Sequence, residues 1–177
     1  TFLDVGAGAG FPSVPLKIIE DSLDLTIIDS LNKRIKFLYN LTKELNINCC
    51  KLIHGRAEEL KQREHFDLVT SRAVAKLNIL LELTLPFVKV NGYFIAYKSI
   101  NYKDELDDAM NAIGVLGGKL ERIEEYIISK EEKRVLIFIK KVKKTDDEEA
   151  EPSDKLSEQH LANIIGRAVA DAISNER

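Results

Sequence analysis

The chain has 177 residues, of which 45% are hydrophobic and 31% are charged, and its formal net charge is −3. This composition is typical of a globular protein with one domain of ordinary size, and it excludes a disordered chain or a bundle of membrane-spanning helices. The charge is uneven, because residues 145–177 carry nine acidic and three basic side chains. The remaining body is therefore mildly basic, which permits nucleic acid as a partner without requiring it.

The predicted elements alternate between strand and helix along most of the chain. Buried strands are expected at 2–5, 25–28, 50–54, 66–71 and 93–97, and helices at 13–21, 31–45, 57–60, 77–87 and 102–116. Five such alternations predict a doubly wound, mostly parallel α/β sheet. Residues 119–128 and 134–139 add two strands joined by a charged turn, so we expect a seven-stranded sheet that ends in an antiparallel hairpin.

The chain divides into three predicted parts. A Rossmann-like domain spans 1–144, an acidic linker spans 145–154, and an amphipathic helix spans 155–177. Two interpretations of that helix are open: it packs on the domain, or it docks a partner chain.

Cysteine and histidine spacing predicts neither a disulfide nor a metal site. Cys49 and Cys50 are adjacent, where a disulfide would be strained, so a reduced pair is expected. The three histidines, His54, His65 and His160, have no ligand spacing with each other or with the cysteines. No apolar run has membrane-spanning length and no signal peptide is visible, so we expect a cytoplasmic protein with no membrane partner.

A glycine-rich turn follows the first predicted strand. Gly6, Gly8 and Gly10 are spaced Gly-x-Gly-x-Gly, which differs from the Gly-x-Gly-x-x-Gly of dinucleotide-binding folds. Glycine allows a ligand to approach the backbone closely. The carboxylate of Asp4, just before the turn, would attract an amino group and repel a pyrophosphate. The combination favours S-adenosylmethionine over NAD, although an ordinary tight turn is the alternative.

Residues after the next two strands are placed to complete a nucleoside site. Asp29 ends the second strand about twenty residues after the glycines, where an acidic side chain accepts both hydroxyls of a ribose. A helix N-cap is the competing interpretation of Asp29, and Ser30 could cap instead. The backbone of Ala57 and Glu58, after the third strand, could pair with the edge of an adenine, or these residues could simply begin a helix.

Several motifs occur together and in order. They are Asp4-Val-Gly-Ala-Gly-Ala-Gly-Phe-Pro12, Ile28-Asp-Ser-Leu-x-Lys-Arg34 followed by Phe37-Leu38, Gly55-Arg-Ala-Glu-Glu59, and Ser71-Arg-Ala73. Over roughly residues 1–142 the chain resembles the glucose-inhibited division protein B family, the guanine-N7 methyltransferases of bacterial small-subunit (16S) ribosomal RNA. The family has a helical segment before the first strand and often a basic tail, whereas this sequence ends in an acidic linker and a helix.

The resemblance implies a role for each matching residue. Gly6 and Phe11 would bound the methionine end of S-adenosylmethionine, Asp29 and Ser30 would lie near its ribose, and Ala57 and Glu58 near its adenine. Arg72 would lie at the junction of cofactor and substrate. Lys98 matches a lysine after the fifth strand, although Ser99 follows it where the family usually has glycine. Arg72 and Lys98 are therefore the predicted catalytic residues.

The implied reaction requires little acid–base chemistry. Guanine N7 carries an available lone pair, so we expect in-line positioning and desolvation to supply most of the rate, and Arg72 to orient the base through O6 or a phosphate. The target base must be unstacked to reach the pocket. Lysines and arginines that could guide ribosomal RNA or the small ribosomal subunit, or be solvated surface charges, are Lys33, Arg34, Lys36, Lys76, Lys98 and Lys103.

Two other functions are weighed against this methyltransferase. One is a catalytically incomplete fragment that binds S-adenosylmethionine or a protein partner. The other is a nicotinamide-dependent oxidoreductase, which the glycine spacing and the terminal hairpin disfavour.

Overall fold

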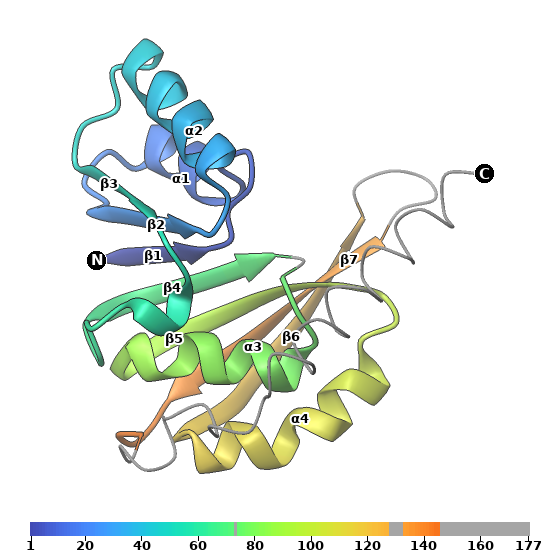
Figure 1. The fold of residues 1–177 in the computed structure, drawn as a ribbon. Coiled ribbons are helices and arrows are strands. Elements are labelled where there is room, and N and C mark those ends of the chain that lie inside the picture. Colours follow the sequence, from blue (N-terminus) through green and yellow to red (C-terminus); the bar gives the residue numbers. More distant parts are fainter. Residues whose placement is uncertain (73, 128–132, 146–177) are drawn as a thin grey trace.

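The computed structural model describes residues 1–72, 74–127 and 133–145, which form a seven-stranded sheet with helices on both faces (Figure 1). The strands are β1 (Phe2–Val5), β2 (Leu25–Asp29), β3 (Cys50–His54), β4 (Phe66–Arg72), β5 (Val88–Ser99), β6 (Gly118–Ile127) and β7 (Lys133–Lys141). The helices are α1 (Ser13–Ile19), α2 (Asn32–Glu44), α3 (Leu77–Thr84) and α4 (Lys103–Val115), with 3₁₀ turns η1 (Ala57–Glu59) and η2 (Leu85–Phe87).

The sheet has the order β3-β2-β1-β4-β5-β7-β6. The first five strands pair in parallel, whereas β7 pairs antiparallel with both β5 and β6. The chain moves outward from β1 to β3 and then returns to β4 on the other side of β1. This reversal creates a switch point at the carboxyl ends of β1 and β4, which is where open α/β sheets bind ligands. The predicted mixed sheet with its antiparallel hairpin is confirmed.

Two hydrophobic clusters attach the helices to the sheet. One cluster contains Phe2, Val14 and Leu38, and joins α1 and α2 to one face. The other contains Leu81 and Ala109, and lies under α3 and α4, which run beside each other in Figure 1. All residues of β1 and β2 are buried. Central parallel strands covered on both faces are mostly apolar, as Phe2, Leu3 and Ile27 are here, and this made the two strands predictable.

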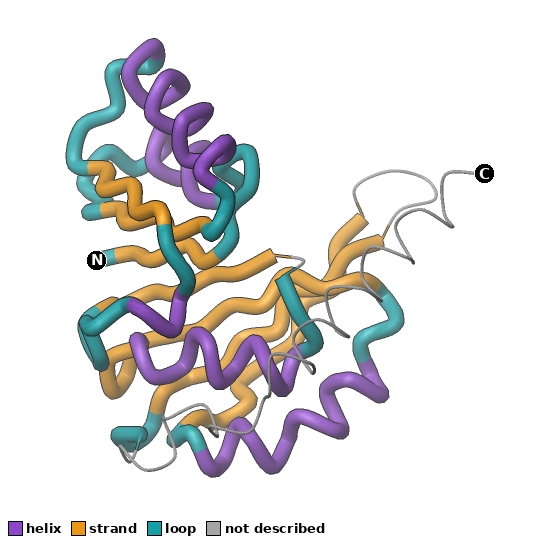
Figure 2. The backbone as a smooth tube through the Cα atoms, in the orientation of Figure 1, coloured by secondary structure: helices purple, strands orange, loops and turns teal. Residues whose placement is uncertain are grey.

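The largest differences from the predicted boundaries are at α3 and β5. The predicted helix at 77–87 ends at Thr84 and continues as η2, since Pro86 has no N–H to donate within a helix. The predicted strand at 93–97 is longer, because β5 begins at Val88 and includes Asn91, which has a φ of +73°, and its pairing with β4 is irregular between Phe66 and Leu68. The strands β5, β6 and β7 have 12, 10 and 9 residues, and Figure 2 draws them in orange.

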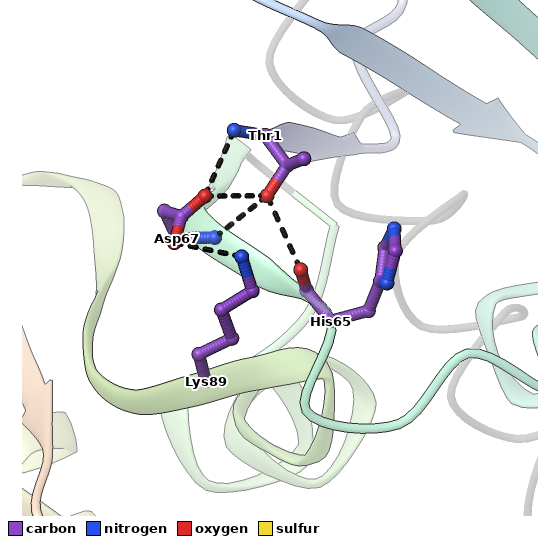
Figure 3. Close-up of polar contacts among 4 residues, drawn as sticks. All are labelled: Thr1, His65, Asp67 and Lys89. Carbon is purple, nitrogen blue, oxygen red and sulfur yellow. Dashed lines mark hydrogen bonds and ion pairs between the residues drawn. The ribbon is translucent and has the colours of Figure 1, made fainter.

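The edge of the sheet opposite the switch point is held by polar contacts (Figure 3). The Thr1 hydroxyl donates to Asp67 Oδ2 at 2.6 Å, and Lys89 Nζ donates to Asp67 Oδ1 at 2.9 Å. These contacts join the start of β1 to β4 and β5. The hydrogen bond from Thr1, with that from Lys89, holds the pKa of the Asp67 carboxyl well below its usual range.

Lys141, at the end of β7, is fully buried at this same edge. Its Nζ donates to the carbonyl oxygens of Leu85 at 3.2 Å and Leu116 at 2.8 Å, and to the Thr145 hydroxyl. Leu85 and Leu116 are the C-cap residues of α3 and α4, so one ammonium group serves the negative ends of two helices. Burial lowers the pKa of Lys141 to about 8.

Some predictions fall outside the described residues. The acidic linker at 145–154, apart from Thr145, and the helix at 155–177 lie there. Within the described part of the chain, no helix is long and apolar enough to cross a membrane, and no three His, Cys, Asp or Glu side chains are grouped so that they could hold a metal ion.

Candidate functional site

The glycine turn between β1 and α1 adopts a backbone that requires glycine. Gly6, Gly8 and Gly10 have φ values of +72°, +60° and +92°. A Cβ on Gly6 would overlap Val74, and a Cβ on Gly10 would lie 2.7 Å from Val14 Cγ2. A Cβ on Gly8 would meet nothing within 4 Å. The turn is thus tightly packed at both ends, and its middle faces open space where a ligand can approach the backbone.

Asp4 is a buried carboxylate with a free oxygen beside this turn. Its Oδ1 accepts a hydrogen bond from the Thr70 hydroxyl at 3.0 Å. Its Oδ2 and the Ser13 hydroxyl are both buried and make no hydrogen bond. Burial raises the pKa of Asp4 to about 6, although neighbouring Ser13 and Thr70 counter part of this effect. A buried carboxylate oxygen without a described hydrogen bond is costly, and this marks Asp4 as a candidate functional residue beside the turn.

Asp29 joins the glycine turn to the start of α2. Its side chain is 1% exposed. Its Oδ2 accepts the Gly8 N–H at 3.2 Å, and its Oδ1 accepts the N–H of Leu31, the N-cap residue of α2, at 2.9 Å. Arg34 Nη1 also lies 3.3 Å from Oδ2. The N-cap residue of α2 is Leu31 and the helix start has no side-chain cap, so the competing interpretation of Asp29 or Ser30 as the N-cap is wrong. Arg34 is a partner of Asp29 that the sequence reasoning placed on the surface.

The turn after β3 is fixed to the end of β2. Gly55 N–H donates to the Asp29 carbonyl at 3.2 Å, and His54 Nε2 lies 3.2 Å from the Ser30 carbonyl oxygen. Ala57 is buried and Glu58 is exposed at the start of η1. The residues predicted to surround a ribose and an adenine thus occupy neighbouring strand ends, with Ser30 exposed to solvent.

Arg72 and Phe11 meet across the switch point. Arg72 is the last residue of β4, and its guanidinium carbon lies 5.7 Å from the centroid of the Phe11 ring. This is within the range of a cation–π contact. Phe11 is half exposed, so the pair forms a flat, positively charged surface at the mouth of the glycine turn.

Lys98, near the end of β5, has its amine engaged. Its Nζ donates to the Ala75 carbonyl at 2.8 Å and to Glu105 Oε1 at 2.7 Å. Its side chain is 11% exposed. Sequence reasoning did not single out Glu105, because its partners Lys98 and Leu77 lie on other elements and no local signal points to them.

Comparison with known proteins assigns the family. The model of the family described as rRNA small subunit methyltransferase G, GidB, matches residues 1–137. The protein named ribosomal RNA small subunit methyltransferase G from Lactobacillus acidophilus is 55% identical over 151 residues, which are 82% of this chain and 62% of that protein. The protein of the same name from Clostridium tetani is 47% identical over 148 residues, 81% of this chain and 62% of that protein. The chain thus spans less than two thirds of the length of these relatives.

Solved structures agree in fold. The structure of M. jannaschii TYW2 in complex with AdoMet has a TM-score of 0.67 at 19% identity, over 80% of this chain and 68% of that one. An rRNA methylase from Streptococcus thermophilus has a TM-score of 0.61 at 14% identity, over 81% of this chain and 87% of that one. At such identities the likeness concerns the fold alone. The family model and the identities near 50% are decisive, and they show that this chain belongs to the rRNA small subunit methyltransferase G (GidB) family.

Proposed function

We propose that this chain is the core of an S-adenosylmethionine-dependent methyltransferase that modifies guanine N7 in small-subunit ribosomal RNA. The observation that carries the proposal is the glycine turn held between two buried carboxylates, one of which keeps an oxygen without a donor. Family membership supports the substrate class, since the relatives are named for it. A ribosomal substrate also implies that the protein works in the cytoplasm.

The residues present fit this cofactor. The free Oδ2 of Asp4 and the open space over Gly8 suit the cationic methionine end. Asp29 has one acceptor direction left beyond its three described contacts. Arg34, which makes one of them, is half exposed and free to give way to a ribose hydroxyl. Ser30, Ala57 and Glu58 would surround the rest of the nucleoside, and Gly6, Gly10 and Phe11 would bound the methionine.

When bound, the cofactor would supply an electrophilic methyl group, and the residues of this chain would position the target base relative to it. Guanine N7 needs no base to free its lone pair, so the role of these residues is to hold the base in line and exclude water. Arg72 is the group best placed to orient the base, because it lies over Phe11 at the rim of the turn. Lys98 supports the same site from β5 through Ala75.

Two alternatives have specific consequences. A nicotinamide-dependent enzyme would place a pyrophosphate beside Asp4, where the free carboxylate oxygen would repel it. An incomplete fragment would bind the cofactor but transfer no methyl group.

The test combines binding and transfer. We expect calorimetry to show binding of S-adenosylhomocysteine, the demethylated cofactor, and Asp29→Ala to weaken it at least about tenfold, because a charged hydrogen-bonding partner is lost. Glu44→Ala, an exposed carboxylate at the far end of α2, is the control. Tritiated methyl transfer to small subunits lacking the modification separates the enzyme from the fragment. Binding of NAD in place of the adenosyl ligand would overturn the proposal.

A further inference from the structure

Glu105 makes two contacts that join three elements at the switch-point edge. Its Oε1 accepts the N–H of Leu77, the first residue of α3, at 2.6 Å, and accepts Lys98 Nζ at 2.7 Å. Glu105 belongs to α4, Lys98 to β5 and Leu77 to α3. A single carboxylate oxygen therefore fixes the start of one helix to a strand end and to the neighbouring helix.

These contacts hold the segment that follows β4. The Ala75 carbonyl accepts Lys98 Nζ, and the Leu77 N–H donates to Glu105, so two points of Val74–Leu77 are tied to one ion pair. Val74, at the start of this segment, lies so close to Gly6 that a Cβ on Gly6 would overlap it. Any loosening of the segment therefore moves the side chain that packs on the glycine turn.

The ion pair depends on both charges because it is largely removed from water. The side chains of Lys98 and Glu105 are 11% and 26% exposed. Removing the carboxylate would leave Lys98 with the Ala75 carbonyl as its described partner, and a mostly buried ammonium without a counter-charge is costly. An amide at position 105 would retain an acceptor for Leu77 but lose the charge.

We propose that Glu105 is a positioning residue, which acts through Lys98 and the segment Val74–Leu77 to hold the glycine turn in the shape that binds the adenosyl cofactor. This inference rests on the proposed function. It assigns to Glu105 an effect on ligand affinity, although Glu105 lies on α4 and touches none of the glycines.

The test measures S-adenosylhomocysteine affinity by calorimetry in the full chain and in four variants. Glu105→Ala should weaken binding at least about fivefold, and Glu105→Gln should recover part of that loss because it keeps an acceptor. Asp104→Asn, an exposed neighbour in the same turn, should leave the affinity within about twofold. Ile113→Val, a buried position further along α4, supplies a variant of lowered stability without a change at the junction.

The outcomes separate a positioning role from a purely structural one. The inference is supported if both variants have lowered melting temperatures and Glu105→Ala binds S-adenosylhomocysteine more weakly than Ile113→Val does. Equal binding by these two variants overturns it, while the unaltered chain still binds and the proposed function stands. If the unaltered chain binds no S-adenosylhomocysteine, the proposed function fails and the inference fails with it.

Discussion

At the scale of single residues, Asp4 shows a conflict between stability and ligand binding. Its carboxyl is fully buried, and one oxygen has no hydrogen-bond donor. Burial raises its pKa from 3.8 in a model peptide to about 6. Above that pH the folded state holds an ionised carboxylate in an unfavourable place, which is a typical sign of a functional site.

This conflict predicts how stability depends on pH. Between pH 4 and 6 the folded state binds more protons than the unfolded state, so Asp4 makes the chain less stable as the pH rises, and this loss is complete above pH 6. Asp4→Asn removes the loss. In chemical denaturation, the stability of Asp4→Asn relative to the unaltered chain should improve by about 2 kcal/mol from pH 4 to pH 7.5. The control Asp24→Asn, at an exposed site before β2, should change the stability by less than about 0.5 kcal/mol. An equal difference at both pH values would contradict the argument.

Gly6 and Gly8 should respond differently to alanine. Gly6→Ala combines a φ of +72° with an overlap against Val74, so we expect it to reduce the free energy of unfolding by about 1–3 kcal/mol. Gly8→Ala meets only the backbone cost, about 1 kcal/mol, because the space around it is open. That space is the proposed ligand position, so Gly8→Ala should lose S-adenosylhomocysteine affinity out of proportion to its stability. Thermal unfolding and calorimetry on both variants measure the two effects, and undiminished affinity in Gly8→Ala would place the ligand elsewhere.

What the sequence reveals of the site depends on how local each contact is. The glycine turn and Asp4 are adjacent in sequence, and Asp29 follows at a spacing set by one strand–helix–strand unit. Contacts of Glu105 with Leu77 cross 28 residues and depend on how α3 and α4 pack, which periodicity does not specify. For that reason, only the structure shows that Lys98 is bound to Ala75 and Glu105 and that Asp4 Oδ2 makes no hydrogen bond.

At the scale of elements, the inner strands β1 and β2 were more predictable than β5 and the order of the last two strands. Fully buried, mostly apolar runs marked β1 and β2, whereas β5 contains Asn91 and Gly92, residues typical of a turn. A hairpin was predicted from β6 and β7, but sequence alone does not show that β7 inserts between β5 and β6. The insertion brings Lys141 to the C-terminal ends of α3 and α4, and no local sequence pattern predicts this contact.

Lys141 should therefore matter for stability far from the site. Lys141→Met leaves the Leu85 carbonyl without this donor and the Leu116 carbonyl with Thr145 alone. The Leu85 carbonyl keeps the Val88 N–H, so the cost comes from losing the hydrogen bonds of a charged donor, and this should lower the free energy of unfolding by about 1–3 kcal/mol. Lys143→Met, at an exposed position two residues on, should change it by less than about 0.5 kcal/mol. Urea denaturation measures the stability of both variants. If Lys141→Met is as stable as the unaltered chain, the removal of a buried charge offsets the lost hydrogen bonds, and the prediction is wrong.

At the scale of the whole molecule, the proposed site depends on the ends of neighbouring strands. The glycine turn follows β1, Asp29 ends β2, η1 follows β3 and Arg72 ends β4. These ends are already joined by contacts such as Gly6 N–H to the Ile28 carbonyl at 2.8 Å. A ligand that touches several of them binds the folded chain and has no comparable site in the unfolded chain, so its binding energy should appear in global unfolding.

This coupling predicts a ligand-specific thermal shift. At a concentration 100 times its Kd, S-adenosylhomocysteine should add about 2.7 kcal/mol of stability, which raises the melting temperature of a chain of this size by roughly 5–10 °C. NAD at the same concentration should produce no shift, because Asp4 and the glycine spacing disfavour a pyrophosphate. Asp29→Ala should lose most of the shift, whereas Lys141→Met should melt earlier yet keep it, since its contacts lie at the opposite edge of the sheet. A shift retained in Asp29→Ala would show that the adenosyl ligand binds away from the ends of β1 and β2.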